Sequence, residues 1–414
     1  MKPVRLTCFA LVGSSTLTLC ACSGTEASGI RERGGSGTMS ETGGSGDSLV
    51  CHPEPGLPPD APELSTALWT NLSPAGFPFN PNTSATGLAF SPCNPSVLYL
   101  CTGSFDPAFG GLYRSTNAGT SWSKIGRVPA TLSGGDHLLG PNHVRVDPSD
   151  PKHVYAVEGV RGDTEGFWVS TDGGDSFTMP DGFRNLPEAA EPIFQYDLYD
   201  LAVDPTDFSH VLVSHHSAWG WTDTKWNTSS GVLESTDGGS TWIIHEPQEG
   251  WGTGHAINFL FDPDKGIGTR DTWLLGTQGN GMWRTTDAGK TWTRVTPNAL
   301  QHGGGTIYYD KAGTLYASGT PNNLRSTDNG EHWTEIGAPS GYTAIFGDGK
   351  QLYTRPVFNM GPFSISPEGG DGTTWTDFST QQFNDGPFEM TLDDINGVLY
   401  SSSWGSGLWA LKLE

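Results

Sequence analysis

Basic residues are scarce in this 414-residue chain, which has 22 Lys and Arg against 45 Asp and Glu and a net charge of −23. This shortage argues against nucleic acid or an anionic lipid surface as the main partner. After the first residues, no apolar run approaches the ~18 residues that a membrane-spanning helix needs. The six cysteines and eleven histidines form neither a CxxC nor an HExxH pattern, so no metal site and no cofactor are predicted.

The N-terminus has the pattern of an export signal. Lys2 and Arg5 precede an apolar stretch over residues 6–19. Leu19-Cys-Ala-Cys22 resembles a bacterial lipobox, which implies a signal peptide over residues 1–22, lipid on Cys22, and a lipid-anchored protein outside the cytoplasm in a bacterial cell envelope. Plain secretion with cleavage nearby is the alternative. Residues 23–60 are rich in Gly, Ser and Thr, as in a flexible tether.

Three cysteines remain for pairing if Cys22 is lipidated. An oxidising envelope favours one disulfide. Cys93 is expected in a turn on the rim where the chain enters the fold, whereas Cys101 falls near the other end of the same strand, too far for the ~4.4–6.8 Å between Cα atoms that a disulfide needs. We therefore predict the pair Cys51–Cys93.

What the chain has in abundance is one eight-residue phrase, called the box below. Its copies begin 40 to 65 residues apart. Self-similarity at roughly this period indicates a propeller or a solenoid, because each unit is a small sheet that cannot bury its faces alone. The copies are STNAGTSW (115–122), STDGGDSF (170–177), STDGGSTW (235–242), TTDAGKTW (285–292), STDNGEHW (326–333) and the degenerate SPEGGDGTTW (366–375).

Strand-like segments flank each box. A Gly and an apolar pair precede it and a short alternating run follows it, which predicts strand, turn and strand. Six complete units and a truncated seventh can be counted. Residues 69–72 copy the missing last strand of the seventh unit, so we predict that residues 61–414 form an all-β, single seven-bladed propeller of four-stranded antiparallel blades, closed by the N-terminal strand.

The box resembles the Asp-box (BNR repeat) of sialidases, sortilin-type receptors and many bacterial propellers. In such families the box lies in the turn between the third and fourth strands of a blade, away from the active face. The resemblance implies that the third-position side chains are structural, namely Asn117, Asp172, Asp237, Asp287 and Asp328.

The ligand face expected for such a propeller is the rim opposite the boxes. The longest loop on that rim carries three tryptophans within eight residues. Aromatic rings among carboxylates suit a sugar, whose C–H faces stack while its hydroxyls form hydrogen bonds. Packing over the channel and contact with a protein partner are the alternatives. The candidate ligand-binding residues are Tyr196, Trp219, Trp221, Asp223, Trp226, Trp251 and His255.

Two enzyme families were compared with the chain. A sialidase needs three arginines on the sugar carboxylate, and only Arg145 lies on an inner strand. Residues 98–102 and 110–114 match the two ends of a xyloglucanase motif that carries a catalytic Asp, and Asp106 approximates that Asp. Those enzymes take a second carboxylate from a second propeller. Here Asp136, Asp200 or Asp385 would have to supply it.

The sequence therefore favours an envelope-anchored, monomeric binding module for a glycan or a surface protein. A glycoside hydrolase of xyloglucanase type or a polysaccharide lyase, using carboxylates on the same face, is the alternative. Photosystem II assembly factors share the single seven-bladed propeller, but no other feature of the sequence indicates photosynthesis.

Overall fold

The computed structural model forms two units, Met1–Asp47 and Ser48–Glu414, and only the second contains described residues. The predicted leader and tether, Cys22 and Cys51 therefore lie outside the described part of the chain. The described residues are 55–80, 83–91, 93–104, 106, 108–129, 136–158, 166–186, 198–215, 231–251, 253–260, 270–278, 280–297, 307–319, 322–337, 339 and 343–414.

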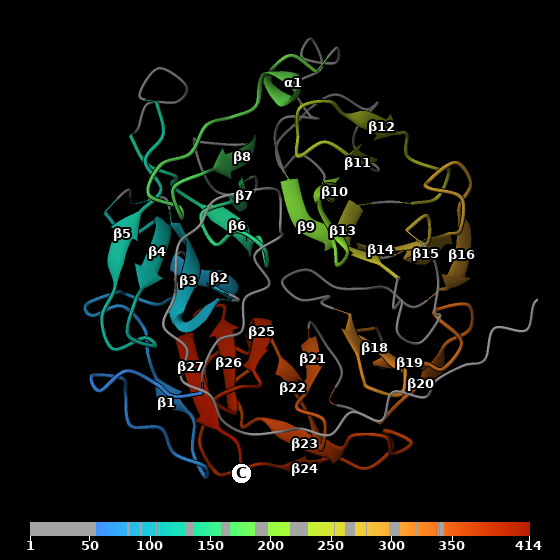
Figure 1. Ribbon diagram of the computed structural model, residues 1–414. Helices are drawn as coiled ribbons and strands as arrows, with labels where there is room; N and C mark the ends of the chain where they lie inside the picture. The colour runs from blue at the N-terminus through green and yellow to red at the C-terminus, as the bar shows by residue number, and fades with distance from the viewer. Residues whose placement is uncertain are drawn as a thin grey trace, which may run out of the picture. The chain divides into compact units, whose positions relative to one another are not determined.

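Seven small antiparallel sheets form a ring, which confirms the predicted propeller (Figure 1). The first strand of each blade is the innermost, and the inner strands of most neighbouring blades contact one another. The first blade comprises β2 (Thr83–Ser91), β3 (Asn94–Ser104), β4 (Gly111–Ser115) and β5 (Ser123–Ile125), and the second comprises β6 (Pro141–Val146), β7 (Val154–Glu158) and β8 (Gly166–Ser170). The third blade comprises β9 (Leu198–Asp204), β10 (Asp207–His215), β11 (Val232–Ser235) and β12 (Ile243–His245). The fourth comprises β13 (Thr253–Phe259), β14 (Trp273–Gln278), β15 (Gly281–Thr285) and β16 (Thr293–Thr296). The fifth blade comprises β17 (Tyr308–Tyr309), β18 (Leu315–Ala317), β19 (Leu324–Ser326) and β20 (Thr334–Glu335). The sixth comprises β21 (Thr343–Gly347), β22 (Gln351–Pro356), β23 (Ser364–Pro367) and β24 (Thr376–Asp377). The seventh comprises β25 (Pro387–Asp393), β26 (Val398–Ser403), β27 (Gly407–Lys412) and the N-terminal strand β1 (Thr70–Asn71).

The second blade departs from the four-stranded pattern. Its sheet has three strands, and the outer position is held only by a bridge between Val169 and Thr178. Pro180 follows two residues later and has no N–H to extend the pairing. It precedes the short helix α1 (Asp181–Arg184), so the segment turns away from the sheet.

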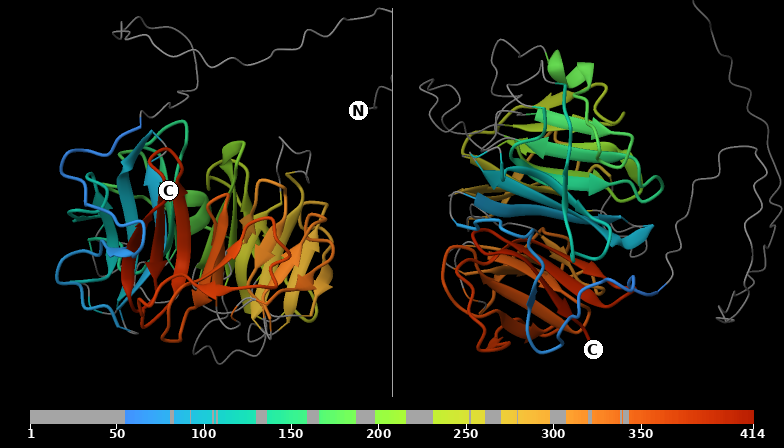
Figure 2. Two further views of the ribbon diagram at one scale, coloured as in Figure 1. Left: turned by 90° about the horizontal axis from the view of Figure 1, so that it is seen from below. Right: turned by 90° about the vertical axis from the view of Figure 1, so that its left-hand side faces the viewer.

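The N-terminal strand closes the ring as predicted. Thr70 pairs with Ala410 and Asn71 with Trp409. Figure 2 shows the blue N-terminal segment beside the red C-terminal sheet. Trp69 is buried and stacks on Phe363, with 4.4 Å between ring centroids. The last blade therefore has no unpaired outer edge at β27.

The boxes form the turns between third and fourth strands. In the second box, Asp172 Oδ1 accepts the Ser170 hydroxyl at 2.8 Å and the Ser176 N–H at 2.9 Å, and Oδ2 accepts the Ser176 hydroxyl at 2.6 Å. The residue after the Asp has a positive φ, even where it is Ala288 (54°). Gly is the usual residue for this left-handed conformation. A structural role for the box carboxylates remains a prediction.

The apolar core lies between the blades. Trp242, which ends the third box, packs with Phe167 and Tyr155 of the second blade. The aromatic residue that closes this box thus packs between two neighbouring sheets. Each such ring removes a large apolar surface from water at about 25 cal/mol per Å².

The cysteines within the fold differ in state. Cys101 is a buried free thiol, and burial raises its pKa well above the ordinary value. Cys93 is disulfide-bonded, and its partner lies outside the described residues. The pair Cys51–Cys93 therefore stays a prediction.

The part of the chain that the structure describes contains no helix long and apolar enough to cross a membrane.

Candidate functional site

The ring has two unlike rims. Strands alternate in direction within each blade, so the turns after the first and third strands share one side, here called the box rim. The loops after the second strands and the links between blades share the other side, here called the loop rim. Most of the candidate ligand and catalytic residues were predicted on or near the loop rim.

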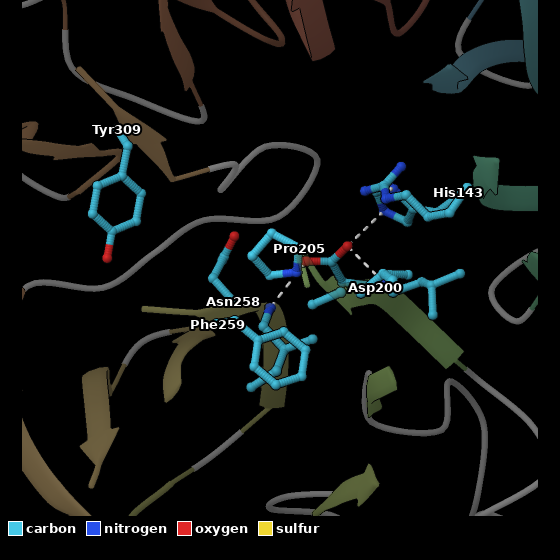
Figure 3. A pocket seen from close by; sticks show the side chains of 11 residues that line it. His143, Asp200, Pro205, Asn258, Phe259 and Tyr309 are labelled. Carbon is cyan, nitrogen blue, oxygen red and sulfur yellow. Dashed lines mark hydrogen bonds and ion pairs between the residues drawn. The ribbon is translucent and has the colours of Figure 1, made fainter. Parts of the chain in front are cut away.

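Four ionisable side chains meet in the central channel. His143 of β6 lies 3.3 Å from Asp200 of β9 and 3.5 Å from Glu389 of β25, and Arg145 lies 2.9 Å from Glu389. His143, Arg145 and Asp200 line one side of a cavity of about 300 Å³ (Figure 3), with Tyr309 on its other side. Three blades thus contribute charge to one buried cluster.

The two channel carboxylates also tie neighbouring blades together. Glu389 accepts the Leu88 N–H of β2 at 2.8 Å, and Asp200 accepts the Ile257 N–H of β13 at 2.9 Å. Burial alone raises the pKa of Glu389, but the charge of Arg145 and the bonds from His143 outweigh it and lower that pKa. Asp200 is therefore held in a hydrogen-bonded ion cluster that fastens the channel wall.

An aromatic row leads from this cluster to the loop rim. The ring of Phe388 lies 5.5 Å from that of His143 and 5.7 Å from that of Trp404. Phe358 lies 5.9 Å from Trp404, edge to face, and is 40% exposed, while Met360 in the same loop is 72% exposed. We call Phe358, Met360 and Trp404 the rim platform.

Asp385 lies beside the rim platform. The Gly386 N–H donates to the carbonyl of Val357, next to Phe358, and the Trp404 N–H donates to the carbonyl of Gly386. Partial burial raises the pKa of Asp385, against the opposing effects of the Arg355 charge and a bond from the Gly405 N–H. A carboxyl with a raised pKa next to an exposed apolar surface is the arrangement of a general acid.

Arg355 stands behind Asp385. It is fully buried, and Nη1 donates to the carbonyls of Gly361 at 2.8 Å and Phe383 at 2.9 Å. Burial lowers its pKa to about 10. Nη2 is buried without a hydrogen-bond partner among the described residues. One donor of this guanidinium is therefore left for a water or a ligand.

The first and second blades hold another acidic group on the loop rim. Asp106, Asp136 and Glu158 all act electrostatically on Lys124, whose pKa burial nevertheless lowers. Asp106 and Asp136 are exposed. Asp136 bonds to His137 at 2.8 Å, which lowers the pKa of Asp136. Two of the four candidate catalytic carboxylates thus lie within electrostatic range of the same lysine.

Several candidate ligand residues cannot be placed. Tyr196, Trp219, Trp221, Asp223 and Trp226 lie outside the described residues.

The other two candidates lie on inner elements. His255 belongs to β13, and its side chain is not among those described. Trp251 is 1% exposed and packs edge to face on Trp292, with 5.1 Å between centroids. Its ring fills the core of the fourth blade because the closing tryptophan of that blade lies beside it.

Sequence reasoning missed Arg355, Glu389 and the rim platform. One signal for the rim platform was present in the sequence. Residues 357–363 connect a second strand to a third strand and contain the apolar residues Phe358 and Met360, although no box lies in this segment. Glu389 and Arg355 carry no such signal, since each lies within an ordinary strand pattern. Among the described residues, no group of three His, Cys, Asp or Glu side chains is placed to hold a metal ion.

No protein-family model matches the chain. Curated xyloglucanases are similar in sequence: that of Paenibacillus sp is 27% identical over 322 residues, covering 70% of this chain and 30% of that enzyme. That of Hypocrea jecorina is 28% identical over 290 residues, covering 63% of this chain and 33% of the enzyme. The chain spans about a third of the length of these relatives. The similarity in sequence supports the glycoside hydrolase alternative more than a pure binding module.

Solved structures show the same fold. An ancestral GH74 enzyme superposes with a TM-score of 0.55 at 17% identity, covering 85% of this chain and 46% of that one. YCF48 bound to D1 peptide superposes with a TM-score of 0.54 at 14% identity, covering 86% of this chain and 99% of that one. At these identities the likeness shows the propeller fold alone.

Proposed function

We propose that this protein is a glycoside hydrolase that acts on a xyloglucan-type glucan at the loop rim. The observation that carries the proposal is Asp385, a half-buried carboxyl of raised pKa beside the exposed side chains of Phe358 and Met360. The substrate class is inferred from the similarity to xyloglucanases. A glucan chain offers flat C–H faces to such a surface.

In the proposed mechanism, Asp385 protonates the leaving glycosidic oxygen and Asp106 is the second carboxylate. Both lie near the segment 77–80. The ring of Phe77 in that segment is 5.7 Å from that of Phe109, near Asp106, and a Cβ added at Gly405 would come within 4 Å of both Asn80 and the Asp385 carboxylate. Asp106 is exposed and free to activate water. A separation of ~6.5–9.5 Å would give inversion and ~5–5.5 Å retention.

The test is hydrolysis of xyloglucan, followed as new reducing ends, together with calorimetric binding of a xyloglucan oligosaccharide. Asp385→Asn should lower the rate ~10²–10⁴-fold with affinity nearly unchanged, because the amide keeps the shape and cannot donate the proton. Asp377→Asn, at an exposed position in β24, is the matched control. Wild-type protein that releases no product from any xyloglucan would overturn the enzyme proposal.

A non-catalytic glycan-binding module is the second candidate. It is supported by the exposed apolar side chains of Phe358 and Met360, which can contact a sugar ring without any catalytic step. Binding without product, weakened by Phe358→Ala and unchanged by Asp385→Asn, would establish this candidate over the hydrolase.

We also propose where the protein is located in the cell. A signal peptide over 1–22, lipid on Cys22 and a tether over 23–60 would hold the propeller of residues 61–414 at a bacterial envelope surface, where polymeric glycans are encountered. The lipobox resemblance supports the anchor, and the disulfide of Cys93 supports an oxidising compartment. A monomeric state and the pair Cys51–Cys93 belong to the same proposal.

A further inference from the structure

A second and larger cavity lies on the box rim, away from the proposed catalytic face. It has a volume of about 720 Å³ and lies among blades five, six and seven. Tyr308, Phe346, Tyr353 and Phe378 contribute aromatic walls. This volume is within the ~300–1,000 Å³ range of small-molecule sites. Tyr309 lines both this cavity and the channel cavity.

The degenerate sixth box contacts two residues of the cavity lining, Tyr308 and Gly349. Its third position is Glu368 where the second to fifth boxes have Asp. The longer side chain leaves its own turn: Oε1 accepts the Tyr308 hydroxyl at 3.1 Å and Oε2 accepts the Gly349 N–H at 2.7 Å. Asp371 takes over the turn by accepting the Thr373 N–H at 2.9 Å. This box carboxylate therefore ties the fifth blade to the sixth.

Gly347 makes this reach possible. A Cβ at that position would come within 2.2 Å of Glu368 Oε2 and 2.5 Å of the Tyr308 ring. Burial raises the pKa of Glu368, and the negative charges of Asp310 and Asp348 add to that effect. The sixth box therefore differs from the other boxes in both sequence and packing, and the difference lies beside the cavity.

Hydrogen-bond donors at the cavity have few acceptors within the protein. Lys311 makes no hydrogen bond or ion pair among the described residues, and Lys350 and Lys412 donate only to main-chain oxygens. Asp348 in contrast accepts the Tyr353 hydroxyl at 2.9 Å and the Lys350 N–H at 2.7 Å. The lining also includes Asp394 and Glu414. Three ammonium groups thus line the cavity together with the carboxylates of Asp348, Asp394 and Glu414.

We propose that this cavity is a second binding site, for a saccharide that bears uronate groups. Rings of Tyr308 and Phe346 would stack on the sugar faces, and Lys311 and Lys350 would bind the carboxylates. Hydroxyls of the sugar can donate to the carboxylates on the lining. The site is independent of the loop-rim chemistry, and its ligand differs in charge from a neutral glucan.

The probe is trigalacturonate, compared with neutral galactotriose by isothermal calorimetry on the full chain. Trigalacturonate should bind at least 10-fold more tightly than galactotriose, and its affinity should fall as salt rises. The double variant Lys311→Gln, Lys350→Gln should lose at least 10-fold in affinity. The control, Lys152→Gln with Lys290→Gln, removes the same charge from exposed positions elsewhere and should change affinity less than 2-fold.

A second variant tests the altered box. Glu368→Asp restores the usual box residue and shortens the reach to Tyr308 and Gly349, so it should weaken trigalacturonate binding while the melting temperature stays within a few degrees. Equal affinity for the two sugars, no binding of trigalacturonate, or equal losses in the two lysine pairs would overturn the proposal. Xyloglucan hydrolysis, measured on the same variants, should be unchanged, so failure of this site and failure of the hydrolase proposal are separate results.

Discussion

Asp385 and Glu234 are both withdrawn from water, and their pKa values move in opposite directions. Burial raises both, but Glu234 lies between His245 at 2.9 Å and His210 at 3.0 Å. These bonds outweigh burial and lower the pKa of Glu234 to about 2. Asp385 has only a more distant Arg355 charge and one main-chain N–H, so burial dominates. The first arrangement joins three strands of the third blade, β10, β11 and β12, and the second leaves Asp385 with a raised pKa.

The depressed pKa of Glu234 predicts an acid-sensitive stability. Its folded pKa lies below the usual 4.5, so its contribution is fully present above about pH 4.5 and is lost as the pH falls toward 2. A shift of this size corresponds to roughly 3 kcal/mol. Urea unfolding of Glu234→Gln should show a loss of that order at pH 6 that shrinks by pH 2.5.

The matched control is Glu249→Gln, an exposed position near the same blade. It should follow the wild-type curve over the whole range. A constant difference between Glu234→Gln and wild type from pH 6 to pH 2.5 would contradict the assignment.

At the scale of elements, blades with the same pattern serve different ends. In each Asp-containing box the carboxylate accepts hydrogen bonds from residues of its own turn. Asp237, for example, accepts the Thr241 N–H at 2.8 Å and the Thr241 hydroxyl at 2.6 Å. The loops on the opposite rim do not repeat. Residues 357–363 expose Phe358 and Met360. In the sequence, residues 216–230 contain three tryptophans. Variation therefore concentrates where the fold does not require a particular residue.

The two kinds of tryptophan should respond differently to truncation. Trp292 packs against the core of the fourth blade and donates to the Gly289 carbonyl at 3.0 Å, so Trp292→Ala should cost about 3 kcal/mol of stability. Trp226→Ala should leave stability unchanged and weaken glycan binding by ~1–3 kcal/mol, as for bases stacked on aromatic side chains. Melting temperature and calorimetric affinity, measured on both variants and on Trp219→Ala, make the comparison. Equal destabilisation by the loop and box variants would remove the loop tryptophans from the ligand face.

At the scale of the whole molecule, the ring depends on a join between residues more than 300 positions apart. The Gln381 side chain receives the Trp69 N–H and donates back to its carbonyl, both at 2.9 Å. The Leu72 N–H donates to the Leu408 carbonyl at 2.9 Å. Through these bonds and the stacked ring of Trp69, the N-terminal strand closes the propeller ring.

Deletion of residues 66–74 should therefore destabilise the entire ring. It exposes the edge of β27 and the apolar face around Phe363, which also favours aggregation. Differential scanning calorimetry should show a melting temperature lower by more than 10 °C, or no cooperative transition. Deletion of residues 30–45 in the predicted tether is the control, with the melting temperature retained. A closure-strand deletion that melts like the wild type would show that the ring does not need its N-terminal strand.

The predicted anchor is tested on the whole chain in cells. Wild-type protein should incorporate a palmitate analogue and fractionate with membranes, because a lipobox cysteine is acylated after cleavage. Cys22→Ser should abolish labelling and leave the leader uncleaved at this site. Equal labelling of the two proteins would refute lipidation at Cys22.

Much of the fold was predictable because each copy of the repeat marks the same turn between two strands of a blade. The period of the boxes, the flanking strands and the copy of the last strand at residues 69–72 together predicted seven blades and their closure. The short second blade was not predicted, because Pro180 ends a strand that the repeat pattern continues.

The sequence by itself determined the architecture, the two rims and the box turns, since these depend on residues close together in the chain. Only the tertiary structure decided which charged side chains meet. His143, Asp200 and Glu389 come from three blades, and Asp385 reaches the rim platform through main-chain bonds between loops. Glu368 looks like a degenerate box residue until Tyr308 is placed beside it. The physical reason is that a propeller brings its sites together across blades, where separation along the chain no longer measures distance.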